Sequence, residues 1–249
     1  MTEKGGWMEL TERLIVAADF DPKKAGSVAD AREQVAALAE KLKGTGVYLK
    51  INSILRACGY SLIVYLHNLG LKVFADLKLV DIPKTMEYDG GFLAEVQPEI
   101  VTMMCCAGID GMNALKQAVG DQTEVLGVTV LTSLNEEECQ SIFTCSTKAG
   151  VLRFARMAQL AGADGLICSP HEAELLKNRR ELLLEGNCPG IRPEWTLVSG
   201  DDQARVMTPA KAIQNGAKRL VIGRPITGAD DPKDAVKRTL EEIQRALEE

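Results

Sequence analysis

Short apolar runs alternate with amphipathic segments along most of the chain. The apolar runs have the length of buried strands, and they lie at residues 14–18, 47–51, 72–76, 100–103, 125–131, 165–168, 185–188 and 219–222. Segments with the helical spacing of apolar residues lie between or after them, at residues 28–43, 54–69, 85–96, 149–161, 170–180 and 232–247. Strands that alternate with helices predict a parallel sheet covered by helices.

The number of strand–helix units makes this prediction more specific. Eight strand–helix units in 249 residues predict an α/β fold of the (β/α)8 TIM barrel type, with residues 1–249 as a single domain. A doubly wound sheet is the alternative with the same order of elements. In a barrel, functional residues lie at the carboxyl ends of the strands, and a phosphate site often follows strands 7 and 8.

Composition excludes several classes of protein. A net charge of -6 argues against a nucleic-acid binder. The sequence has no apolar run of about 18 residues, which argues against a membrane span. The first residues lack the apolar core of a secretory signal, so we expect a cytoplasmic protein. Seven cysteines without a C-x-x-C pair predict reduced, mostly buried thiols and no metal site.

Polar residues follow most of the predicted strands. At or just after the strand ends stand Asp19, Lys50, Asp76 with Lys78, Thr132, Arg192 in the stretch PGIR that begins at Pro189, and Arg224 after Gly223. A surface ion pair or a helix cap would explain each of them separately. Because the carboxyl ends of barrel strands meet at one rim, their joint placement predicts a functional site there.

The end of the third strand, FADLKLVDIPKT at residues 74–85, is unusually charged. Asp76 and Lys78 are two residues apart, so on a strand they point the same way, and Asp81 follows where the chain turns. Pro83 should stop the strand, and Thr85 should cap the next helix. A structural ion-pair network is the alternative, but buried networks are costly, and alternating charges more often mark a site.

The stretch DLKLVDIPKT resembles the D-x-K-x-x-D-I-x-x-T signature of the orotidine 5'-phosphate decarboxylase family. The resemblance continues in the same order through VTVLTS at 128–133, DGLICSP at 164–170, PGIRP at 189–193, DQARVMTP at 202–209 and LVIGRPIT at 220–227. It implies a cofactor-free (β/α)8 homodimer without a metal. It also implies conversion of orotidine 5'-phosphate to UMP and CO₂, the last step of de novo UMP synthesis.

The resemblance implies catalytic roles at the third strand. An alternating charge tetrad would consist of Lys50, Asp76, Lys78 and Asp81. Lys78 would donate a proton to C6 of the pyrimidine, and Asp76 would lie next to the substrate carboxylate. These roles agree with the chemistry, because loss of CO₂ leaves a carbanion at C6 that an ammonium can stabilise and then protonate.

The resemblance implies further substrate contacts around the cavity. Asp19 and Lys50 would hold the ribose hydroxyls, and Thr132 would contact the pyrimidine. The residues expected to reach the partner's site across a dimer interface are Asp81, Ile82 and Thr85. The residues expected to bind the phosphate, or to close a loop at 193–205 over it, are Arg192, Gln203, Gly223 and Arg224, and Pro189 is also expected to bind substrate.

Some positions depart from the family's pattern. Lys84 stands where bacterial relatives usually carry Asn, and Met104 stands where many relatives have His. Residues 135–147 match poorly, and we assign them no role. Two rival interpretations remain. One is a Mg²⁺-dependent relative, such as a 3-keto-L-gulonate 6-phosphate decarboxylase or a hexulose-phosphate synthase. The other is a catalytically silent phosphate-binding barrel.

Overall fold

Eight parallel strands form a closed barrel in the computed structural model, which describes residues 9–196 and 207–248. The strands are β1 (Leu14–Ala17), β2 (Tyr48–Ile51), β3 (Lys72–Leu79), β4 (Ile100–Met104), β5 (Glu124–Val128), β6 (Gly165–Ile167), β7 (Gly186–Cys188) and β8 (Ala217–Ile222). They pair in sequence order, and β8 closes the ring against β1, with Leu14 opposite Leu220. The TIM barrel predicted from the alternating pattern is therefore confirmed.

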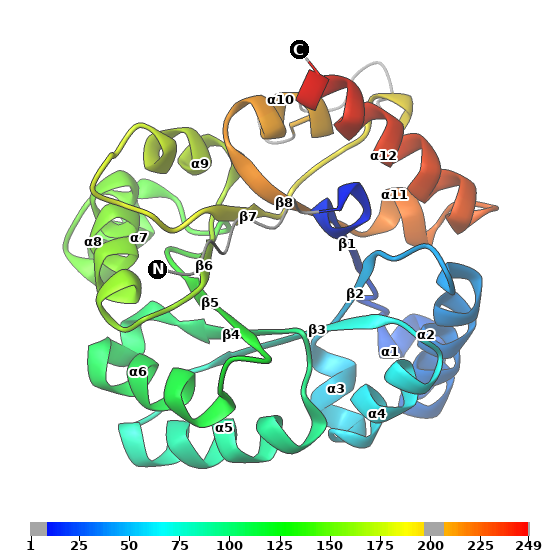
Figure 1. Cartoon of the computed structure of the whole chain (residues 1–249), viewed down its shortest axis with the longest axis horizontal. Coiled ribbons are helices and arrows are strands. Elements are labelled where there is room, and N and C mark those ends of the chain that lie inside the picture. Colours follow the sequence, from blue (N-terminus) through cyan, green and yellow to red (C-terminus); the bar gives the residue numbers. More distant parts are fainter. Residues whose placement is uncertain (1–8, 197–206, 249) are drawn as a thin grey trace.

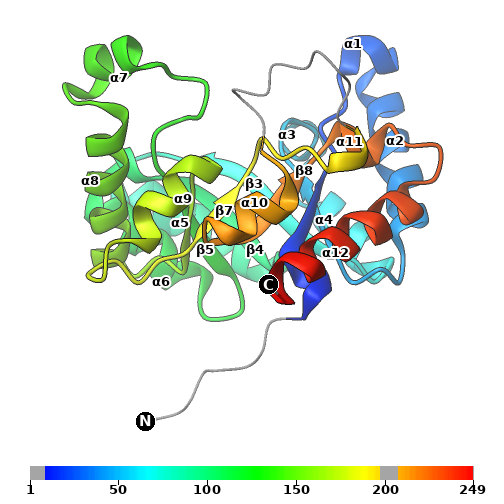
Figure 2. The ribbon, with the colours of Figure 1, turned by 90° about the horizontal axis from the view of Figure 1, so that it is seen from above.

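Helices form an outer ring around the strands (Figure 1). They are α1 (Pro22–Ala25), α2 (Val28–Leu42), α3 (Ser53–Cys58), α4 (Ser61–Asn68), α5 (Pro83–Val96), α6 (Gly108–Val119), α7 (Glu136–Phe143), α8 (Thr147–Leu160), α9 (Pro170–Lys177), α10 (Pro209–Gln214), α11 (Arg224–Thr227) and α12 (Pro232–Glu248). Short 3₁₀ helices lie at Leu10–Arg13, Cys105–Ala107 and Glu194–Thr196. Figure 2 shows α1 and α7 raised on the side of the barrel opposite the end of α12. None of the helices in the described part of the chain could span a membrane.

The strands are apolar on both faces because both are buried. The inner face fills the barrel with a small separate cluster, made of Ile15, Ala17, Tyr48, Phe74, Ile100, Leu126 and Val221. The alternate positions, such as Leu14 and Val16 of β1, pack outward against the helices in a much larger core. This explains why the strands read as continuous apolar runs.

Several predicted boundaries were wrong. The helix expected at 54–69 is two helices, α3 and α4, because Gly59 takes a φ of +74° and ends the first. The strand expected at 125–131 ends at Val128. Thr85 does not cap α5, since that helix already begins at Pro83 and its N-cap residue is Ile82. Residues 135–147 contain α7, which begins with a capping box between Asn135 and Glu138.

Candidate active site

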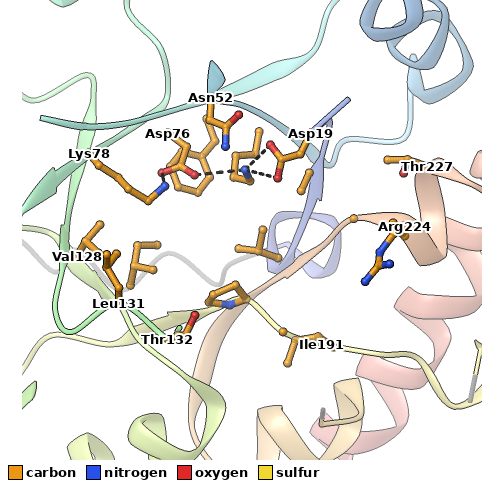
Figure 3. Close-up of a pocket in the computed structure, with 18 of the residues that line it drawn as sticks. Asp19, Asn52, Asp76, Lys78, Val128, Leu131, Thr132, Ile191, Arg224 and Thr227 are labelled. Atoms are coloured by element: carbon orange, nitrogen blue, oxygen red, sulfur yellow. Dashed lines mark hydrogen bonds and ion pairs between the residues drawn. The ribbon is translucent and has the colours of Figure 1, made fainter. Parts of the chain in front are cut away.

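A cavity of about 530 Å³ lies at the carboxyl ends of the strands (Figure 3). Its charged lining residues in the described part of the chain are Asp19, Lys50, Asp76, Lys78, Arg192 and Arg224. Each of them lies in the second half of a strand or follows one, so the barrel brings together side chains that are up to 205 positions apart in the sequence. A volume of this size suits a small organic ligand.

Asp76 is the centre of the charged group. Its Oδ1 atom lies 2.7 Å from Nζ of Lys78, and its Oδ2 atom lies 3.2 Å from Nζ of Lys50. The ammonium of Lys50 also donates to Asp19 Oδ1 at 2.8 Å. Positive and negative groups therefore alternate along one wall of the cavity, as the dashed lines in Figure 3 show.

The surroundings of Asp76 keep its carboxyl group ionised. Burial raises its pKa, but the charges of Lys50 and Lys78 and hydrogen bonds from Lys78 and Thr102 lower the pKa overall. The side chain of Asp76 is only 9% exposed, whereas that of Lys78 is 33% exposed. The ammonium of Lys78 is thus tethered to a fixed anion and still reaches the cavity.

The backbone of β3 is irregular at these residues. Ala75 pairs with Val101 and Leu79 pairs with Met103, so the register of β3 against β4 shifts between Ala75 and Leu79. Lys78 has a φ of +50°, which an L-residue rarely adopts. Asp76 and Lys78 do face the same cavity, as the strand periodicity predicted, but a bulge rather than a regular strand presents them.

Two arginines, Arg192 and Arg224, also line the cavity. Arg192 follows β7, and its backbone N–H donates to the carbonyl oxygen of Met207 at 3.0 Å. Arg224 directly follows Gly223 at the end of β8, and Thr227 lies close behind it. Figure 3 shows Arg224 and Thr227 on the side of the cavity away from Lys78. The cavity therefore has a lysine–carboxylate end and an opposite end that carries the guanidinium of Arg224.

The remaining predicted site residues separate into three groups. Thr132 and Pro189 line the cavity. Gln203 lies outside the residues that the structure describes. Asp81, Ile82 and Thr85 are absent from the described lining of this cavity; Asp81 instead accepts the N–H of Ile82 at 2.7 Å.

Comparison with known proteins places this geometry in a family. The profile of the orotidine 5'-phosphate decarboxylase / HUMPS family matches residues 12–239. The chain belongs to this family. An orotidine 5'-phosphate decarboxylase of Streptococcus sanguinis is 37% identical over 228 residues, which cover 90% of this chain and 94% of that protein. The enzyme of the same name from Streptococcus uberis is 39% identical over 194 residues, with coverages of 76% and 83%.

Solved structures agree with this assignment. The crystal structure of orotidine 5'-phosphate decarboxylase from Lactobacillus acidophilus superposes with a TM-score of 0.76 at 30% identity, over 93% of this chain and 99% of that one. The enzyme from Pyrococcus horikoshii has a TM-score of 0.67 at 22% identity, over 93% and 99% of the two chains, and shares the fold.

Two polar residues that lie near the charged group were not predicted from the sequence. Asn52 lines the cavity and caps α3 by accepting the N–H of Ser53. Its position just after the second strand, in LKIN, is a signal that could have found it. Thr102 lies in the middle of β4 and contacts Asp76, yet in the sequence it looks like one more residue of a buried strand.

Other groups that could have carried chemistry lie elsewhere. His67 pairs with Glu99 at 3.2 Å, and both are outside the cavity lining. All seven cysteines are free thiols. Over residues 9–196 and 207–248, no three His, Cys, Asp or Glu side chains are grouped so that they could hold a metal ion.

Proposed function

We propose that this chain decarboxylates orotidine 5'-phosphate to UMP and CO₂, the last step of de novo UMP synthesis. One observation carries the proposal: the ammonium of Lys78 is held 2.7 Å from the buried, ionised carboxylate of Asp76 at one end of the cavity. The full-length relatives named as orotidine 5'-phosphate decarboxylases support it, since the S. sanguinis match spans 90% of this chain.

The charges of the cavity complement the substrate. Orotidine 5'-phosphate carries a carboxylate on its ring and a phosphate at its other end. Among the described residues, the lining holds four cationic side chains and two carboxylates, so this part of the lining has an excess of positive charge. With the phosphate bound by Arg192 and Arg224, the pyrimidine would lie toward Lys78, and Asp19 and Lys50 would hold the ribose hydroxyls.

Lys78 is the residue that we assign to the chemical step. Departure of CO₂ leaves an electron pair at C6 that cannot delocalise into the ring, so it must be stabilised by a nearby charge. The ammonium of Lys78 supplies a preorganised positive charge and then transfers a proton to C6. Asp76 directs this ammonium, because its carboxylate holds the Lys78 Nζ atom at 2.7 Å.

The active form is proposed to be a homodimer. Exposed apolar side chains lie after β3 and on α5 and α6, two helices that pack against each other: Val80, Ile82, Tyr88, Phe92 and Ile109, which are 54%, 66%, 57%, 62% and 38% exposed. A large exposed apolar patch is typical of an interaction surface. Burying it against a second copy would carry Asp81, Ile82 and Thr85 toward the partner's cavity, where Asp81 would complete the charge tetrad.

The deciding experiment follows the loss of orotidine 5'-phosphate absorbance with purified protein, with and without EDTA. We expect conversion to UMP at the same rate in both. Conversion only with added Mg²⁺ would move the chain to the metal-dependent members of its family. Binding of UMP without any turnover would identify a catalytically silent barrel.

A further inference from the structure

Thr102 makes two hydrogen bonds to Asp76 and Lys78, the residues of β3 that line the cavity. Its side chain is fully buried in β4. The hydroxyl donates to Asp76 Oδ1 at 2.9 Å and accepts the backbone N–H of Lys78 at 2.9 Å. A hydroxyl is one of the few side-chain groups that can donate and accept at once, and here it uses both capacities on residues of β3.

Thr102 is also the only residue of β4 that faces the bulge of β3. Ala75 pairs with Val101 and Leu79 with Met103, so three residues, 76–78, stand opposite Thr102 alone. The bulge includes the left-handed conformation of Lys78, which costs an L-residue free energy that the surroundings must offset. The hydrogen bond from the Lys78 N–H to Thr102 is one such contact.

We propose that Thr102 is a positioning residue for the decarboxylation, which fixes the direction of the Lys78 ammonium from both ends of that side chain. This inference rests on the proposed function. At the base of Lys78, Thr102 holds the backbone in the bulge. At the tip of the Lys78 side chain, Thr102 donates to the same Asp76 oxygen atom that the ammonium contacts at 2.7 Å. The side chain of Lys78 has four rotatable bonds and is 33% exposed, so its aim depends on these two restraints.

The first test replaces the hydroxyl by a methyl group in Thr102→Val, which keeps the shape of the side chain. We expect kcat to fall by roughly 10- to 100-fold, the usual effect of losing a buried hydrogen bond to a charged group. Binding of UMP should change by less than about threefold, because UMP has no carboxylate at C6. Thr102→Ser keeps the hydroxyl and should retain kcat within about threefold of the original chain.

A second readout separates positioning from general stability. Asp76 faces Lys50 on β2, Lys78 on β3 and Thr102 on β4, with Asp19 beyond Lys50. Removing the hydroxyl takes away a donor to the ionised carboxylate and therefore raises the pKa of Asp76. In the pH profile of kcat/KM, the fall in activity on the acid side should move to higher pH in Thr102→Val and stay in place in Thr102→Ser.

Thr123→Val is the matched control. Thr123 is equally buried, and its hydroxyl donates to the carbonyl oxygen of Pro98 at 2.7 Å, at the amino end of β5, away from the cavity. Its loss should lower stability without moving kcat or the pH profile. Where Thr102→Val does not fold, Thr102→Cys replaces it, and its weak thiol donor should give an intermediate kcat.

The outcomes distinguish the two proposals. A folded Thr102→Val protein with the original kcat and pH profile would overturn the role of Thr102 and leave the proposed function intact. Equal losses in the Val and Ser variants would also overturn it, because the hydroxyl would then not matter. If the original chain does not convert orotidine 5'-phosphate at all, it is the proposed function that fails.

Discussion

The ammonium of Lys78 lies 2.7 Å from a carboxylate oxygen of Asp76, while the other oxygen of that carboxylate lies 3.2 Å from Lys50. Asp76 is therefore held between two cations and cannot follow Lys78 if that side chain moves. Both ammonium groups line the cavity, but the Lys50 side chain is only 7% exposed, whereas that of Lys78 is 33% exposed. This asymmetry agrees with the roles proposed above, in which Lys50 fixes the carboxylate and holds the ribose and Lys78 acts on the reacting carbon.

Replacing Lys78 by alanine should abolish turnover. The variant loses both the charge that stabilises the C6 carbanion and the acid that protonates it, so we expect kcat to fall at least about 10³-fold. Steady-state kinetics with orotidine 5'-phosphate measure the loss, and circular dichroism shows whether the fold is kept. Lys237→Ala, at an exposed position of α12, should keep full activity. Turnover near the original rate in folded Lys78→Ala would remove Lys78 from the mechanism.

Replacing Arg224 by alanine should weaken phosphate recognition selectively. A guanidinium–phosphate contact contributes about 1.5–3 kcal/mol, so KM for orotidine 5'-phosphate should rise roughly 10- to 100-fold. The nucleoside orotidine lacks the phosphate, and its slow conversion should be unaffected. Arg156→Ala, whose side chain is exposed beside Glu181, serves as the control for a lost surface arginine. Equal losses on the nucleotide and the nucleoside would place Arg224 outside the phosphate site.

The barrel and most of its rim could be predicted from sequence because both depend on local patterns. Strands buried on both faces read as apolar runs, and polar residues such as Asp19 and Lys50 stand out where those runs end. Thr102 could not be predicted, because its role depends on a register shift between β3 and β4. The break between α3 and α4 at Gly59 was missed because the apolar spacing continues across it.

Mixing two inactive variants tests whether Asp81 acts in the partner's site. Lys78→Ala and Asp81→Asn should each be inactive, but a heterodimer would combine Lys78 of one subunit with Asp81 of the other in one intact site. Random pairing should restore about a quarter of the original activity. Asp81→Asn keeps an oxygen that can accept the Ile82 N–H, so the local turn should be preserved.

The matched control for this mixing mixes Lys78→Ala with Asp76→Asn. Asp76 and Lys78 contact each other within one chain, so every site of that heterodimer carries a lesion and activity should not return. Recovery in both mixtures would show that the return of activity does not depend on Asp81 of the partner, and would contradict the shared site. A monomer by sedimentation, with no recovery in either mixture, would contradict the homodimer.

The opposite end of the barrel supplies a stability prediction. Arg219 of β8 has a side chain that is 3% exposed, and it donates to Glu124 Oε1 at 2.6 Å and Oε2 at 2.9 Å. Glu124→Gln would leave this guanidinium without its counter-charge. We expect the free energy of unfolding at pH 7 to fall by about 2–3 kcal/mol, measured by urea denaturation. Glu241→Gln, which removes a loose surface pair at 3.9 Å, should cost less than about 0.5 kcal/mol.

The Arg219–Glu124 pair also predicts how the stability difference between the original chain and Glu124→Gln depends on pH. Burial raises the pKa of Glu124, but hydrogen bonds and charge from Arg219 lower it overall. A carboxyl group whose pKa is lowered by folding stabilises the protein above its unfolded pKa, about 4.3 for Glu, and loses that contribution as the pH falls through the folded pKa. The gap between the original chain and Glu124→Gln should thus be constant from pH 6 to 8 and shrink below about pH 4. A gap that stays constant down to pH 3 would mean that packing around Arg219, and not the charge of Glu124, is what the substitution disturbs.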